Sequence, residues 1–151
     1  MGTDRPAIAA MAVESLAVLS RDECQRRLHH GRLGRVAVVV DAVPAIFPVN
    51  YALLDEEIVF RTAPGTKLCA GILERVVAFE VDGTTLDFTS GWSVLVVGRA
   101  AQIHYPAMLE RAQRLGLRPW VRGPRDYFVK ITSEHISGRS YGPGQLDGDG
   151  C

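Results

Sequence analysis

The segment AIFPVNYALLDEEIVFRTAPGTKL, residues 45–68, holds two strand-like stretches and two turns. Both stretches are rich in β-branched and aromatic residues, and the polar DEE between them predicts two adjacent strands joined by a short turn. In the first, alternate apolar residues from Ala45 to Leu53 share one face. Pro48 lies on the opposite face and has no amide hydrogen, which predicts an edge position or a bulge. The backbone at Val49 and Asn50 would then be partly free to face a ligand.

Similar stretches lie on both sides of this segment. GRVAVVV (34–40) precedes it, and RVVAFEVD (75–82), WSVLVVGRAAQI (92–103) and DYFVKI (126–131) follow it. Successive strands joined by short turns, with few helices, predict a mainly β fold whose antiparallel sheet closes into a small barrel of about six strands. Gly98, in the middle of a strand, predicts a bulge or close packing. TSEHISGRSY (132–141) is expected to be a closing turn.

Three short helices are predicted, at about residues 20–30, 66–73 and 106–115. Ser20 and Glu23 form a capping box at the start of the first helix. Thr66 can cap the second, and Pro106 suits the first turn of the third. The expected organisation is an N-terminal extension over residues 1–18, one domain over 19–140, and a Gly- and Asp-rich disordered tail over 141–151.

The composition excludes several classes of function. Seventeen Lys and Arg residues balance seventeen Asp and Glu residues, whereas nucleic-acid binders usually carry a basic excess. No apolar run approaches the length of a membrane span, and no secretory cleavage pattern is present. The three cysteines are widely spaced and show no metal-binding pattern. We therefore expect a cytoplasmic protein with reduced thiols that binds neither nucleic acid nor membrane.

FRTAPGTKL, residues 60–68, has the side chains of an anion site. Thr62 and Thr66 offer hydroxyls, Lys67 an ammonium, and Arg61 a planar guanidinium that can hold a phosphate with two hydrogen bonds. Gly65 would allow close approach of the backbone. The same residues would also occur if Thr66 only capped a helix while both basic side chains were solvated. From the residues alone, both interpretations stay open.

The chain resembles the pyridoxamine 5′-phosphate oxidase-like family, the FMN-binding split barrels, and in particular its actinobacterial flavin/deazaflavin-dependent branch. Six segments occur in the family's order between residues 19 and 139: LSRDECQRRLHHGRLGRVAV, PAIFPVNYAL, IVFRTAPGTKL, VAFEVD, GWSVLVVGRA and VKITSEHISGR. The resemblance implies a homodimeric FMN-binding flavoprotein, an oxidoreductase that acts on an unidentified small molecule. Its C-terminal HISGRSY matches only loosely the extra basic residues of true pyridoxamine 5′-phosphate oxidases, so a different substrate is expected.

The resemblance also implies which residues contact the cofactor. The phosphate would be held by Arg61, Thr62, Thr66 and Lys67. The isoalloxazine ring would be contacted by Pro48, Val49 and Asn50. The flavin bound by the other subunit, or the subunit interface, would be contacted by Trp92 and Ser93.

Two alternatives to this function remain. The first is a reductase or binding protein for the deazaflavin F420, which also carries a phosphate and a tricyclic ring. The second is a non-enzymatic flavin- or haem-binding stress protein, with His104 or His135 as a haem ligand.

Glu80 and Asp82 lie two residues apart on one strand face and offer carboxylates for acid–base chemistry. No residue is identified as a catalytic nucleophile, as expected where a cofactor carries the chemistry.

Overall fold

A computed structural model describes residues 16–120 and 126–142 of the chain. In chain order the elements are β1 (Leu16–Val18), α2 (Arg21–His30), β2 (Leu33–Val40), β3 (Val43–Leu54), β4 (Glu57–Thr62), α3 (Lys67–Ile72), β5 (Arg75–Thr84), β6 (Gly91–Gln102), α4 (Pro106–Gln113) and β7 (Tyr127–Tyr141). The three predicted helices are confirmed to within a few residues. Most of the expected N-terminal extension and C-terminal tail lies outside the described residues, although residues 16–18 already form β1.

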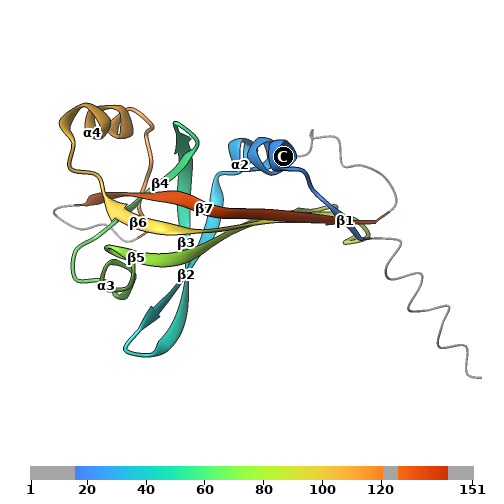
Figure 1. Cartoon of the computed structure of the whole chain (residues 1–151), viewed down its shortest axis with the longest axis horizontal. Helices are drawn as coiled ribbons and strands as arrows, with labels where there is room; N and C mark the ends of the chain where they lie inside the picture. The colour runs from blue at the N-terminus through green and yellow to red at the C-terminus, as the bar shows by residue number, and fades with distance from the viewer. Residues whose placement is uncertain (1–15, 121–125, 143–151) are drawn as a thin grey trace, which may run out of the picture.

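The strands form one antiparallel sheet that closes on itself (Figure 1). Their order is β1-β7-β4-β3-β2-β5-β6, and an additional pairing of β6 with β7 completes a ring of six strands. Strand β1 pairs with the end of β7. The predicted mainly β fold and antiparallel barrel are therefore confirmed.

The ring is incomplete on one side of β3. Residues from Val43 to Asn50 pair with β2, but β4 joins β3 only from Tyr51 to Leu54. Pro48, opposite Arg35 of β2, thus lies where β3 has a neighbour on one side only among the described strands. A residue that cannot donate a backbone hydrogen bond is tolerated at such a local edge. The edge position predicted for Pro48 is confirmed.

The barrel interior is filled by buried apolar side chains, as the alternation along the strands predicts. Phe60 of β4 and Phe79 of β5 are fully enclosed, and burial of each contributes about 1.5–3 kcal/mol. Tyr51 packs edge-on against Phe79 with ring centroids 4.8 Å apart. Its hydroxyl donates to the Leu28 carbonyl oxygen at 2.8 Å and so joins α2 to the barrel. Burial raises the pKa of Tyr51, which keeps this hydroxyl protonated.

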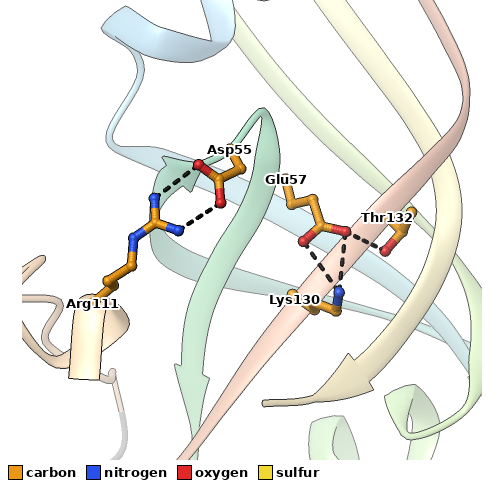
Figure 2. Close-up of polar contacts among 5 residues, drawn as sticks. All are labelled: Asp55, Glu57, Arg111, Lys130 and Thr132. Atoms are coloured by element: carbon orange, nitrogen blue, oxygen red, sulfur yellow. Dashed lines mark hydrogen bonds and ion pairs between the residues drawn. The ribbon is translucent and has the colours of Figure 1, made fainter. Parts of the chain in front are cut away.

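A smaller apolar cluster lies between α4 and the barrel. It contains Leu54, Val59, Ile103, Ala112 and Phe128. Figure 2 shows how polar contacts fix the same region. Arg111 of α4 donates to both carboxylate oxygens of Asp55 in the β3–β4 turn, at 2.6 and 2.8 Å. These contacts set the position from which the chain leaves α4 and returns to β7.

Three further hydrogen bonds join β4 to β7, as Figure 2 shows. Lys130 donates to both oxygens of Glu57 at 3.2 Å, and the Thr132 hydroxyl donates to the same carboxylate at 2.6 Å. Both partners of the Lys130–Glu57 ion pair are largely buried, with side chains 30% and 20% exposed. The pair holds β4 in register just before the segment that carries Arg61 and Thr62.

The closing turn expected at residues 132–141 is wrong, because this segment is the second half of β7. It pairs with β6 from Gly91 to Arg99 and, at its end, with β1. A bulge between Val97 and Gly98 places one extra β7 residue there and breaks the alternating pattern, so the polar stretch does not read as a strand. A Cβ on Gly98 would lie 2.2 Å from the Thr132 carbonyl oxygen. The bulge and close packing predicted at Gly98 are therefore confirmed.

Candidate functional site: an apolar cavity with a polar corner

A cavity of about 220 Å³ opens beside the incomplete side of β3. Three parts of the chain line it: the middle of β3, the end of β4 with the loop into α3, and the segment that follows α4. The lining residues are Phe47, Pro48, Val49, Arg61, Thr62, Ala63, Thr66, Leu68, Pro119 and Trp120. Most of these side chains are apolar, and the polar ones come from the segment 61–66. The cavity therefore suits a largely apolar ligand with one polar end.

The polar corner is formed by two threonines. The Thr66 hydroxyl donates to the Ala63 carbonyl oxygen at 2.9 Å and accepts from the Cys69 amide at 3.1 Å, which caps α3. The Thr62 side chain is buried, and its oxygen lies 3.3 Å from that of Thr66. Because a hydroxyl has a single hydrogen, Thr62 is the donor of this bond. Each hydroxyl can donate to a ligand in the corner only by giving up a present bond.

Gly65 makes the turn that places this corner. Its φ of 78° lies in the left-handed region, and, its two chain neighbours aside, no atom of the described residues lies within 4 Å of the position of a Cβ. A residue with a side chain would be strained by the backbone conformation and not by a collision. The turn lets Thr66 cap α3 directly behind Thr62.

Arg61 borders the cavity, but its guanidinium already has partners. Nη1 donates to the Leu117 carbonyl oxygen at 2.8 Å, and Nη2 forms an ion pair with Asp126 at 2.6 Å. The guanidinium carbon also lies 5.2 Å from the centre of the Phe128 ring. The Asp126 side chain is 9% exposed, and its Oδ1, like Nε of Arg61, has no hydrogen-bond partner in the described part of the chain. Arg61 thus holds the connection between α4 and β7.

Asn50 holds the same connection from β3. Its Nδ2 donates to the Arg118 carbonyl oxygen at 3.0 Å, and its Oδ1 accepts from the indole Nε1 of Trp120 at 3.3 Å. Asn50 does not line the cavity itself, but its two hydrogen bonds hold part of the cavity wall in place. Pro119 and Trp120, which sequence reasoning did not select, complete that wall. A Pro-Trp pair just after a helix was the available signal for them.

The remaining residues that were expected to contact the cofactor do not line the cavity. Lys67 is the first residue of α3 and is exposed beside Thr66. Trp92 and Ser93 begin β6, where they pair with β5 and β7, and Trp92 packs against the Arg27 guanidinium at 5.0 Å. Neither lines the cavity of its own chain. The structure thus brings together Pro48, Val49, Arg61, Thr62 and Thr66, with Asn50 and Lys67 adjacent to them.

The remaining candidates lie outside the cavity lining. Glu80 and Asp82 both contact Arg35 at 3.4 Å. Partial burial and the neighbouring Asp82 raise the pKa of Glu80, while Arg35 opposes that rise. His104 and His135 are exposed. In the described part of the chain, no helix is long and apolar enough to span a membrane.

Comparison with known proteins agrees with this geometry. Residues 20–140 match the protein family described as pyridoxamine 5′-phosphate oxidase. An uncharacterized protein of Mycobacterium tuberculosis is 37% identical over 125 residues, which are 80% of this chain and 82% of that protein.

Two solved structures have the same fold. The FAD-binding protein of Mycobacterium smegmatis superposes with a TM-score of 0.73 at 36% identity, covering 83% of this chain and 99% of that one. A candidate pyridoxamine 5′-phosphate oxidase of Corynebacterium glutamicum superposes with a TM-score of 0.74 at 32% identity, covering 85% and 99%.

Proposed function

Because the chain belongs to the pyridoxamine 5′-phosphate oxidase family, we propose that its cavity binds a flavin nucleotide. The observation that carries this proposal is the joining of apolar walls to a polar corner in one cavity. Phe47, Val49 and Leu68 suit a planar ring system, while Thr62 and Thr66 suit a phosphate. The similar M. smegmatis protein is an FAD-binding protein, which supports the same ligand class.

The residues at the polar corner differ in how readily they can bind a phosphate. Lys67 is exposed beside Thr66 and can approach an anion without losing a bond that holds the fold. Arg61 can do so only by exchanging Asp126 or the Leu117 carbonyl oxygen for the phosphate. We therefore assign Lys67 as the principal phosphate ligand, and Arg61, Thr62 and Thr66 would join it after exchanging a present bond.

The recognised part of the ligand is the part that FMN and FAD share. Both contain the isoalloxazine ring, the ribityl chain and a first phosphate, which is the group that the threonine corner would hold. The family resemblance of the sequence implies FMN, and the similar M. smegmatis protein binds FAD. A bound flavin would supply hydride or electron transfer to an unidentified small molecule, which makes the protein an oxidoreductase. The chain's own residues bind and orient the cofactor.

We also propose that the protein is a homodimer whose partner completes the site. Trp92 and Ser93 do not line the cavity of their own chain, so they would reach a flavin only from a second copy. The β2–β3 hairpin, which projects from the barrel in Figure 1, carries the exposed apolar residues Val39, Val43 and Ile46. Exposed apolar side chains gathered on one projecting element suit an interface.

Absorbance of the purified protein and titration with riboflavin, FMN and FAD test the cofactor class. We expect a flavin spectrum, or saturable quenching of added flavin, and tighter binding of FMN or FAD than of riboflavin. Binding of F420 alone, a haem band alone, or no binding of any flavin would overturn the proposal. Equal affinity for riboflavin and FMN would show that the protein binds the flavin ring but does not recognise the phosphate.

A further inference from the structure

We infer that Trp120 is the aromatic wall against which the flavin ring packs and that Asn50 is the positioning residue for its indole, an inference that rests on the flavin site proposed above. Trp120 follows α4 and lines the cavity together with Phe47, Val49 and Leu68. Phe47 and Trp120 are the aromatic side chains in that lining. A planar heteroaromatic ring in the cavity would therefore have an indole available as one contact surface.

The exposure of Trp120 points to a missing contact. The residue is 59% exposed although it borders an apolar cavity. Its polar group is already satisfied, because Nε1 donates to Asn50. What remains open is the apolar surface of the indole, which gains free energy only when something apolar covers it. Aromatic pairs add to this gain through their geometry.

Three hydrogen bonds hold the segment 117–120, which carries Trp120, in place. Asn50 uses both ends of its amide on this segment, one on the Arg118 backbone and the other on the Trp120 indole. Arg61 adds a third bond, to the Leu117 carbonyl oxygen. These ties from β3 and β4 fix the segment 117–120 before any ligand arrives, which lowers the entropy cost of binding.

Other exposed aromatic residues in the described chain do not share this placement. Phe88 lies in the β5–β6 loop and Tyr105 precedes α4, and neither lines the cavity. Phe88 is therefore a suitable control, because its replacement by alanine removes a similar exposed apolar surface at a place that is not part of the site.

The first test measures riboflavin and FMN affinity for wild type, Trp120→Ala, Trp120→Phe and Phe88→Ala. We expect Trp120→Ala to weaken both ligands equally, on the order of tenfold, and Trp120→Phe to keep most of the affinity. Phe88→Ala should bind like wild type. A loss confined to FMN would instead assign Trp120 to the phosphate end and overturn the inference.

The second test addresses Asn50 through spectroscopy. In a Trp92→Phe background, Trp120 is the remaining tryptophan of the chain, so its emission reports on this wall alone. In this background Asn50→Ala should increase quenching of Trp120 by acrylamide in the ligand-free protein, and in a chain with Trp92 intact Asn50→Ala should weaken riboflavin binding severalfold. Unchanged quenching in a folded Asn50→Ala protein, as judged by circular dichroism, would contradict the positioning role.

If wild type binds flavin and Trp120→Ala binds it equally well, the ring wall is wrong while the flavin site stands. If wild type binds no flavin, both are wrong.

Discussion

Arg61 and Lys67 are both basic residues of FRTAPGTKL, but the structure treats them in opposite ways. Arg61 is bonded to Leu117 and paired with a nearly buried Asp126, whereas Lys67 is exposed at the start of α3. The sequence contains no sign of this difference, because the partners of Arg61 lie about sixty residues later. The distinction decides which basic residue is ready to meet a phosphate.

Replacement of Lys67 by alanine should weaken FMN binding and leave riboflavin binding almost unchanged. Loss of a charge-assisted hydrogen bond costs about 1.5–3 kcal/mol, which is roughly ten- to hundredfold in affinity. The melting temperature without cofactor should barely move, because Lys67 is exposed. Fluorescence titration measures both affinities, and Arg26→Ala, which removes an exposed cation on α2, is the matched control. FMN binding as tight as that of wild type would remove Lys67 from the site.

Replacement of Asp126 by asparagine should shift the protein's preference towards phosphate-bearing flavins. The change removes the charge that competes for the Arg61 guanidinium. We expect the ratio of riboflavin to FMN dissociation constants to rise roughly threefold or more, equivalent to about 0.7 kcal/mol. The free energy of unfolding should fall by about 1–3 kcal/mol, because a partly buried charged hydrogen bond is weakened. An unchanged or smaller ratio in the folded variant would show that Arg61 does not reach the phosphate.

At the scale of elements, local signals predicted the helices and most strands. Ser20 accepts from the Glu23 amide and Glu23 accepts from the Ser20 amide, as the capping box requires. Thr66 caps α3 in the same local way. The second half of β7 was missed because the bulge at Gly98 interrupts the alternation there. A capping signal lies within a few residues, whereas a strand is completed by pairing with a neighbour that is often distant in sequence.

Separation in sequence also decides which residues of the candidate site could be grouped from the sequence. Residues that are near one another in sequence, such as Thr62 and Thr66, lie together in the cavity lining, and their binding of a phosphate stays a prediction. Trp120 was missed because its contact with Asn50 spans 70 residues. Trp92 and Ser93 could not be placed at a site within one chain, and their role towards a partner's flavin stays a prediction.

Replacement of Gly98 by alanine should destabilise the closure between β6 and β7. The added Cβ would lie 2.2 Å from the Thr132 carbonyl oxygen, so the backbone must shift. Overpacking of this kind costs about 1–3 kcal/mol, which thermal or urea unfolding can measure. Ser93→Ala, at an exposed position of the same strand, is the control. A variant as stable as wild type would mean that the strands separate there at little cost.

At the scale of the whole molecule, the barrel brings distant parts of the chain to one cavity. β3 and β4 supply two sides, and α4 delivers the segment 117–120 to the third. The Arg111–Asp55 pair and the small apolar cluster under α4 fix the start of that segment. Since the Arg111–Asp55 pair is exposed, the apolar cluster contributes more to the position of α4 than the ion pair does.

Replacement of Ile46 by lysine should convert a dimer into monomers without unfolding the protomer. Ile46 is 67% exposed on the β2–β3 hairpin, so a charge there costs little in one chain but is unfavourable inside an apolar interface. Sedimentation at micromolar concentration distinguishes the two states. Flavin affinity should fall together with dimerisation, because Trp92 and Ser93 of a partner would be lost. A wild-type monomer that binds flavin tightly would contradict both parts.

Diffraction from crystals grown with FMN tests the central claim most directly. The account predicts ligand density in the cavity, with the ring against Trp120 and Val49 and the phosphate within hydrogen-bond distance of Thr62, Thr66 or Lys67. Density for the flavin elsewhere on the molecule, with this cavity empty, would contradict it.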